Sequence, residues 1–219
     1  MNLFRKELAV LPITVIENWK DLEPEVLKHI KQTDVVVDIG CGIKPQNLFT
    51  PKVHIGIEPY SEYIEHLEKN LANRDRTFIF INSTWDILRK FPSNSVDTII
   101  FTDVIEHLSK MQGKKLLKEA ERVAKVQVIL FTSLGFLPQC HPDGKDAWGL
   151  DGGKWQDHKS GWEPKDFHDK WNIYLCEKFH YGKDEDNLFE EPYGAFWGIL
   201  NIEPGEEQNQ AFTVLLPGQ

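Results

Sequence analysis

Residues 35–46 read VVVDIGCGIKPQ, a run of β-branched residues that leads into two glycines separated by one position. The apolar run is short and ends at Gly40, which is typical of a buried strand over residues 34–40. Gly40 and Gly42 allow a tight turn and let a ligand approach the backbone without a Cβ in the way. In an open parallel sheet, such a turn lies outside the carboxyl ends of the strands, where ligands bind. A plain strand-to-helix turn that needs glycine for its own geometry is the alternative interpretation.

Strand and helix patterns alternate on both sides of this turn. The sequence predicts further strands over residues 52–58, 77–82, 95–103 and 127–133, and helices over residues 21–32, 61–74 and 115–125. This alternation predicts a parallel sheet with helices on both faces. Further along, the pattern indicates a helix over residues 164–172 and two more strands over residues 173–181 and 194–203.

Size and composition are those of a globular protein. The 219 residues, 41% hydrophobic and 27% charged, predict one domain with a sizeable core. The net charge of −9 argues against broad binding to a phosphate backbone, so no DNA partner is expected and RNA is disfavoured. Three cysteines without paired spacing favour a reducing cytoplasm over a disulfide framework or a structural zinc site.

Neither membrane insertion nor a signal peptide is expected. No apolar run approaches the roughly 18 to 20 residues that a membrane helix needs. The first apolar stretch, residues 8–16, contains Pro12 and is not followed by a small-residue cleavage site.

An acidic residue at the end of the second predicted strand narrows the choice of ligand. Glu58 follows Asp38 by twenty positions, and a carboxylate there suits the two hydroxyls of a ribose. A dinucleotide fingerprint would require glycine at the position of Pro45, beneath a pyrophosphate. A nucleoside ligand without a pyrophosphate therefore fits better than NAD. A solvated loop acid is the alternative interpretation of Glu58.

Three motifs together resemble a known family. DIGCG at residues 38–42, IGIE at residues 55–58 and FPSNSVDTIIFTDVIEHL at residues 91–108 resemble class I S-adenosylmethionine (SAM)-dependent methyltransferases. The similarity is greatest to type-11-like domains whose fourth-strand motif reads DV[IL]EHL, and it covers residues 35–133. It implies a Rossmann-like sheet of seven mostly parallel strands with helices on both faces and an antiparallel last strand. It also implies SAM as the cofactor and S-adenosylhomocysteine (SAH) as the product.

The resemblance assigns cofactor-binding roles to residues at the carboxyl ends of four strands. These are Asp38, Gly40, Cys41, Gly42, Glu58, Ser83, Thr84, Trp85, Thr102 and Asp103. Asp38 would orient the glycine turn, Glu58 would hold the ribose, and Asp103 would lie near the methyl donor. Ser83 stands where many relatives have an aspartate for the adenine, so Asp86 is an alternative partner through a shifted loop. Lys44 stands where many relatives have a further glycine.

The fourth-strand motif raises the question of a metal. Asp103, Glu106 and His107 have the spacing of one helical face, and carboxylates with an imidazole can bind a divalent cation. Some SAM-dependent O-methyltransferases, including small-RNA 2′-O-methyltransferases, are similar in using such a set with a further ligand. The favoured interpretation is that Glu106 and His107 hold the local structure by hydrogen bonds. His107 is retained as a candidate catalytic residue.

Residues 134–163 form a Gly-, Pro- and Trp-rich insertion after the fifth predicted strand, where this fold places substrate-binding segments. Tryptophans offer flat apolar walls for a ring or sugar, and Gln139, Trp148 and Trp162 are the predicted acceptor-binding residues. His158 is the predicted general base, ahead of His141, because residues 160–162 follow it and can pin the loop. A structural or solvated role for the histidines is the alternative.

The sequence thus predicts a single domain over residues 1–219, with residues 1–33 as an N-terminal cap and residues 134–163 as a substrate-side insertion. The predicted function is methyl transfer from SAM to an oxygen or nitrogen of a small-molecule acceptor, a sugar or sugar nucleotide being one such acceptor. A metal-assisted RNA 2′-O-methyltransferase and a non-catalytic SAM-binding protein stay open as alternatives. A nicotinamide-dependent dehydrogenase is more remote because of Pro45.

Overall fold

The computed structural model describes residues 10–71, 77–182 and 188–203. The strands in this part of the chain are β1 (Ile13–Val15), β2 (Val35–Ile39), β3 (Val53–Glu58), β4 (Thr77–Asn82), β5 (Val96–Thr102), β6 (Ala124–Ser133), β7 (Trp171–Gly182) and β8 (Leu188–Asn201). The α-helices are α1 (Trp19–Leu27), α2 (Ser61–Leu71), α3 (Lys110–Val123) and α4 (Gly153–Gln156). The 3-10 helices are η1 (Trp85–Lys90), η2 (Ile105–His107) and η3 (Pro164–Asp166).

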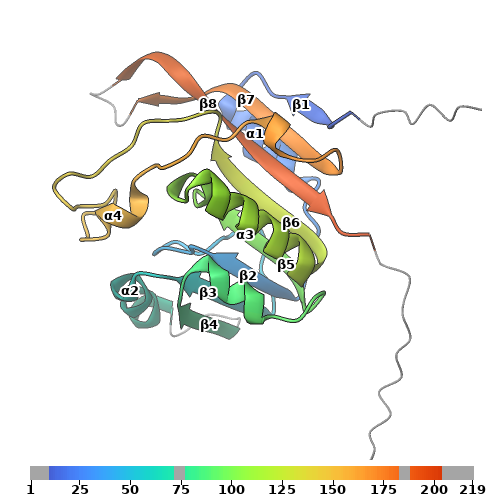
Figure 1. The fold of residues 1–219 in the computed structure, drawn as a ribbon, viewed down its shortest axis with the longest axis vertical. Helices are drawn as coiled ribbons and strands as arrows, with labels where there is room; N and C mark the ends of the chain where they lie inside the picture. The colour runs from blue at the N-terminus through green and yellow to red at the C-terminus, as the bar shows by residue number, and fades with distance from the viewer. Residues whose placement is uncertain (1–9, 72–76, 183–187, 204–219) are drawn as a thin grey trace, which may run out of the picture.

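The strands form one sheet in the order β1-β7-β8-β6-β5-β2-β3-β4 (Figure 1). β8 runs antiparallel to both of its neighbours, β6 and β7, and the other neighbouring pairs are parallel. The predicted Rossmann-like architecture with an antiparallel last strand is therefore confirmed. The described sheet has eight strands rather than the predicted seven, because residues 13–15 add β1 to its edge beside β7.

Helices cover both faces of the sheet, as predicted. Val36 and Val37 belong to different cores, because successive side chains of a strand point to opposite faces. The core that contains Val37 includes Leu116 and Ala120 of α3. The core that contains Val36 includes Leu22 of α1. Each face of the sheet is therefore closed by an amphipathic helix.

The predicted helix over residues 164–172 is wrong. Only the turn η3 forms there, closed by reciprocal hydrogen bonds between Glu163 and Asp166, and β7 already begins at Trp171. Phe167 and Trp171 are both buried, with ring centroids 5.3 Å apart, so the segment packs as an aromatic corner. In contrast, the helix predicted over residues 115–125 is longer than expected. It begins at Lys110, where Ser109 and Gln112 form a capping box.

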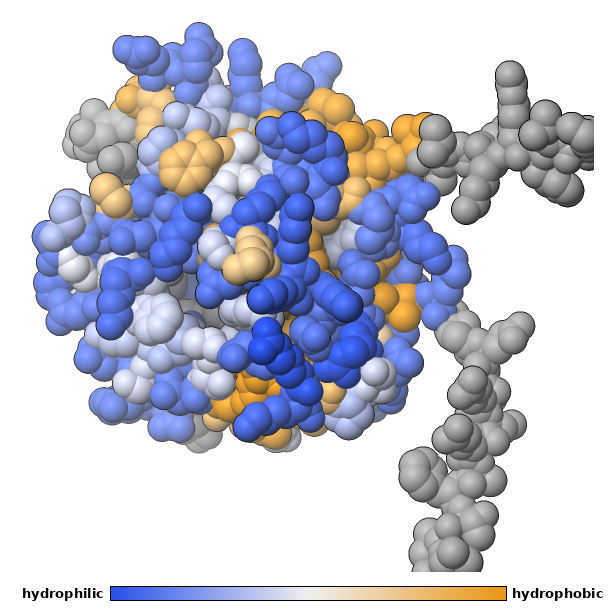
Figure 2. Space-filling view, in the orientation of Figure 1, coloured by the Kyte–Doolittle hydropathy of each residue, from blue (hydrophilic) through white to orange (hydrophobic). Residues whose placement is uncertain are grey.

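Residues 10–33, in the region predicted as an N-terminal cap, supply β1 and α1. None of them is among the described residues that line the large cavity. Exposed apolar side chains, among them Val10, Ile13 and Val15, gather along β1 (Figure 2). None of the helices in the described ranges has the length and apolar character needed to cross a membrane.

Candidate functional site

A cavity of about 1350 Å³ opens at the carboxyl ends of β2, β3 and β5, between the sheet and the insertion. The turn after β2, Glu58 of β3 and Asp103 after β5 form one wall. The insertion supplies the other, through residues that include Trp148 and His158. In Figure 1 the insertion with α4 lies on the same side of the molecule as α2. The structure thus brings the segments of the predicted site together.

The glycine turn has the geometry that the sequence predicted. Gly40 and Gly42 have φ values of +64° and +53°, which favour glycine. A Cβ on Gly40 would lie 2.7 Å from Cγ2 of Val104, so this residue also permits close packing. The side chain of Cys41 turns away into a small core with Leu67, and burial raises the pKa of its thiol. Cys41 therefore offers its backbone rather than a reactive thiolate.

Asp38 holds the turn from within the protein. Its Oδ2 accepts a hydrogen bond from the backbone N–H of Gln46 at 2.8 Å and lies 3.0 Å from Nε2 of His54. Both side chains are buried, and the His54 ring stacks on Phe78 with centroids 5.1 Å apart. Sequence reasoning missed His54. The sequence feature that could have identified His54 is its position in β3, which puts it on the same face of the sheet as Asp38.

Glu58 presents a carboxylate whose two oxygens are each fixed by one backbone donor. Oε2 accepts from the N–H of Gly42 at 3.0 Å, and Oε1 accepts from the N–H of Tyr60 at 2.9 Å. Burial raises the pKa of this carboxyl to about 7. Each carboxylate oxygen has a second lone pair, so the group can still accept from two hydroxyls. This arrangement suits a ribose.

The segment after β4 contributes residues to the cavity wall and one residue that extends the sheet. Thr84, Trp85 and Asp86 line the cavity, and the Thr84 hydroxyl donates to Asp86. Ser83 instead continues the end of β4, where its N–H donates to the carbonyl of Glu58 at 3.1 Å. Among the described residues that line the cavity, Asp86 is present and Ser83 is not. Asp86 is therefore the better placed of the two for an adenine contact.

Beyond β5, two acids lie close together at the floor of the cavity. Asp103 has a φ of +52°, and the buried Glu106 accepts a hydrogen bond from the Thr132 hydroxyl at 3.0 Å. Desolvation raises the pKa of the buried Glu106 carboxyl, and the nearby charge of Asp103 raises it further. The expected helical face is only the short turn η2. Thr102, at the end of β5, also lines the cavity.

His107 and His158 meet beside these acids, with ring centroids 4.9 Å apart. Nδ1 of His107 lies 3.2 Å from the carbonyl oxygen of Asp157, and Nδ1 of His158 lies 2.6 Å from that of Leu137. A carbonyl accepts only, so both rings carry their proton on Nδ1 when neutral and keep Nε2 as an acceptor. Burial lowers the pKa of both imidazoles. Ligand atoms of Glu106, His107 and His158 all lie within 4.8 Å of one another.

Of the three predicted acceptor-binding residues, two line the cavity and one lies in the protein interior. Gln139 lines the cavity and donates to the carbonyl of Gln156 at 2.8 Å. Trp148 lines the cavity next to the glycine turn, where a Cβ on Gly42 would lie 2.5 Å from its Cη2. Trp162 is wrong as a cavity wall, because its side chain is fully buried. Its indole finds its partners inside the protein.

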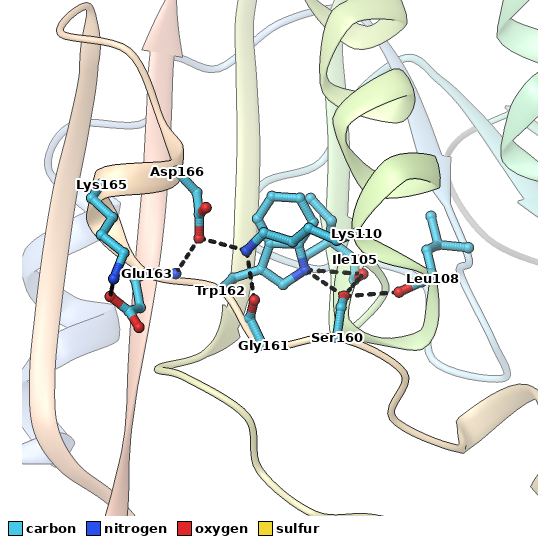
Figure 3. A network of polar contacts seen from close by, with 9 residues as sticks. All are labelled: Ile105, Leu108, Lys110, Ser160, Gly161, Trp162, Glu163, Lys165 and Asp166. Atoms are coloured by element: carbon cyan, nitrogen blue, oxygen red, sulfur yellow. Dashed lines mark hydrogen bonds and ion pairs between the residues drawn. The ribbon is translucent and has the colours of Figure 1, made fainter.

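Trp162 instead anchors the insertion to the body of the domain (Figure 3). Its Nε1 donates to the carbonyl of Ile105 and to the hydroxyl of Ser160 at 3.2 and 3.0 Å. Nζ of Lys110 lies 3.8 Å from the centroid of the Trp162 ring and also contacts Gly161 and Asp166. This network fixes the chain immediately after His158.

The anchored chain reaches the acidic floor directly. The N–H groups of Lys159 and Ser160 both donate to the carbonyl of Glu106, at 2.7 and 3.1 Å. His158 is therefore held beside His107 by backbone hydrogen bonds to the same turn. The sequence argument that residues 160–162 pin this loop agrees with these contacts.

Comparison with known proteins adds the class of enzyme. Residues 37–132 match the family model of a methyltransferase domain. Comparison with curated proteins gives no match. The matched methyltransferase segment contains the glycine turn, Glu58, Asp103 and the His107 turn, whereas the whole insertion lies outside it.

Solved structures support the same fold. A SAM-dependent methyltransferase from Methanosarcina mazei has 15% identity and a TM-score of 0.57, with 82% of this chain and 98% of that chain covered. A magnesium protoporphyrin IX methyltransferase from Synechocystis PCC 6803, solved with bound SAH, has 14% identity, a TM-score of 0.51 and coverage of 83% and 80%. The similarity to a cyclopropane synthase from Mycobacterium tuberculosis, at 19% identity and a TM-score of 0.43, covers 53% of this chain and only 42% of that protein.

The family match and the shared fold support a SAM-dependent methyltransferase, as the sequence predicted. A neighbour of the same fold is solved with SAH bound, in agreement with the predicted cofactor.

Proposed function

We propose that this methyltransferase transfers the methyl group of SAM to an oxygen or nitrogen of a small-molecule acceptor, such as a sugar or sugar nucleotide. We also place it with the domains whose motif reads DV[IL]EHL. The observation that carries the proposal is the carboxylate of Glu58, fixed by the N–H groups of Gly42 and Tyr60 at the wall of the cavity. That carboxylate would bind the ribose, and the glycine turn held by Asp38 would make room for the methionine part.

SAM supplies an already activated methyl group, so the protein's task is alignment and the removal of one proton from a hydroxyl acceptor. Nε2 of His158 would receive that proton, because Nδ1 is committed to the carbonyl of Leu137. Burial lowers the pKa of His158, which keeps the ring neutral and able to accept near pH 7. Gln139 and the insertion would bind the acceptor on the side of the cavity where His158 lies.

Calorimetric titration with SAM, SAH and NAD tests the cofactor assignment. We expect SAM and SAH to bind and NAD not to bind. Asp38→Ala should weaken SAH binding at least tenfold, a loss of about 1.4 kcal/mol, because the turn loses its internal acceptor. Asp38→Asn, which keeps one oxygen acceptor, should lose less, and the exposed Asp169→Ala should bind like the wild type. NAD binding in preference to SAH would refute the proposal.

A metal-assisted 2′-O-methyl transfer to RNA is the second candidate, favoured by one observation. Glu106, His107 and His158 can offer three ligand atoms within 4.8 Å of one another. Both imidazoles donate Nδ1–H to a backbone carbonyl, an arrangement common for metal-binding histidines. A divalent cation held there would lower the pKa of an acceptor hydroxyl. The net charge of −9 favours a small acceptor over RNA.

Titration with Mn²⁺ separates the two candidates. If the site binds metal, the wild type should bind Mn²⁺ and His158→Ala should bind it at least tenfold more weakly, through loss of one ligand. His168→Ala is the matched control, because His168 is exposed and pairs with Glu121 outside the cluster. Absence of Mn²⁺ binding, with methyl transfer insensitive to a chelator, would remove the metal candidate and leave His158 as the base.

A further inference from the structure

Within the insertion, residues 143–153 fold around a single carboxylate. Oδ1 of Asp146 accepts from the N–H groups of Trp148 and Leu150 at 2.9 and 2.8 Å, and Oδ2 accepts from the N–H of Gly152 at 3.2 Å. Asp146 itself is buried, at 7% exposure. Desolvation alone would raise its pKa, but its hydrogen bonds, that from Tyr63 above all, lower it. The segment is therefore an ordered loop around a charged acceptor.

One side chain from outside the insertion joins this loop to the cofactor side of the domain. The hydroxyl of Tyr63, in α2, donates to Oδ2 of Asp146. Tyr63 is 2% exposed and also receives a weaker hydrogen bond from Gln156 at 3.4 Å. A Cβ on Gly152 would lie 2.0 Å from the Tyr63 hydroxyl, so the glycine is what lets the loop approach so closely. A hydrogen bond to a buried ionised carboxylate is among the stronger kinds.

The loop places Trp148 over the turn that binds Glu58. Cη2 of Trp148 lies 2.5 Å from where a Cβ on Gly42 would be, and the N–H of Gly42 is the donor to Glu58. The Trp148 ring packs edge-to-face on Tyr63, with centroids 5.1 Å apart. Gly42, Glu58, Tyr63 and Trp148 all line the same cavity. The indole thus faces the predicted ribose position beside Glu58.

We propose that residues 143–153 form a flap over the cofactor. In this proposal Trp148 contacts SAM at the ribose, and the hydrogen bond between Tyr63 and Asp146 is the latch that holds the flap on α2. Cofactor exchange then requires the latch to open. The proposal rests on the proposed function, and it reassigns Trp148 from the acceptor to the cofactor. The far end of the insertion stays anchored at Trp162, so the flap opens without release of His158.

Hydrogen exchange measured by mass spectrometry, with and without saturating SAH, tests the flap. We expect SAH to slow exchange in residues 38–42 and also in residues 146–152, because the N–H groups bonded to Asp146 exchange when the flap opens. Slowing in residues 38–42 alone would overturn the flap and leave the proposed function standing. No change in either segment, together with no heat on SAH titration, would overturn both.

Two variants and one control give the kinetic test. Tyr63→Phe removes only the latch hydroxyl and should speed SAH dissociation about tenfold, as loss of a charge-assisted hydrogen bond predicts. Trp148→Ala should weaken SAH binding about tenfold through loss of its contact. Lys52→Ala, outside the flap, removes only an exposed ion pair with Asp34 and should change neither value. Dissociation from Tyr63→Phe within twofold of the wild type, with full affinity in Trp148→Ala, would contradict the proposal.

Discussion

Replacing Trp162 with alanine should lower the free energy of unfolding by about 3–5 kcal/mol, the range for removing a fully buried tryptophan. The substitution removes an indole with no exposed surface that packs in the core between the sheet and α3. It also leaves Nζ of Lys110 without the ring face that it covers. Urea denaturation followed by circular dichroism measures this change through the midpoint, provided that the slope is unchanged.

Two control variants separate the causes of that loss. Trp162→Phe keeps an aromatic ring but removes the donor to Ile105 and Ser160, so it should cost less than alanine. Trp19→Ala removes a tryptophan that is 43% exposed, and it should cost about 1 kcal/mol or less. The anchoring role of Trp162 fails if Trp162→Ala costs no more than Trp19→Ala.

The affinity for SAH should fall about tenfold between pH 8 and pH 6, because the carboxyl of Glu58 has a pKa of about 7 and only its ionised form accepts from both ribose hydroxyls. Calorimetric titration across this range measures the change. Glu58→Gln should bind SAH at least tenfold more weakly at pH 8, and the part of the pH dependence due to Glu58 should be missing. The same steep pH dependence in Glu58→Gln would rule out this carboxyl as its source.

The stability of the unliganded protein should change in the opposite direction. The folded-state pKa of Glu58 is raised above the usual 4.5, so the native state binds this proton more tightly than the unfolded chain. The contribution of Glu58 to stability is therefore fully present below about pH 4.5 and is lost as the pH rises through 7. The comparison of wild type with Glu58→Gln isolates this contribution from those of the other acids.

The sequence was most informative where local pattern and buried position coincide. The strands that became β2 to β6 were predicted because short β-branched runs in a parallel sheet have few alternatives. The eighth strand was missed because β1 has only three residues and all of them are exposed, so no alternation marks it. The predicted helix over residues 164–172 failed because aromatic packing of Phe167 and Trp171 overrode a helix-compatible pattern.

The site residues, too, were predictable where the local sequence determines their position. Gly40, Gly42 and Glu58 were predictable because each lies at a strand end and its role depends on the backbone nearby. The roles of Trp148 and Trp162 were not predictable, because both lie in an insertion without periodicity whose course depends on distant partners. Tyr63 is one such partner, and Lys110 is another. These two tryptophans of similar local context thus divide between cavity wall and interior anchor only in three dimensions.

The position of β8 has a consequence for synthesis on the ribosome. β8 lies between β6 and β7, yet it follows both in the chain, and β1 has its partner in β7 at residues 173–175. A nascent chain that has just made β7 therefore still lacks β8, the strand that joins the β1–β7 pair to the rest of the sheet. Until residues 188–201 emerge, the unpaired edges of β6 and β7 are open to wrong partners.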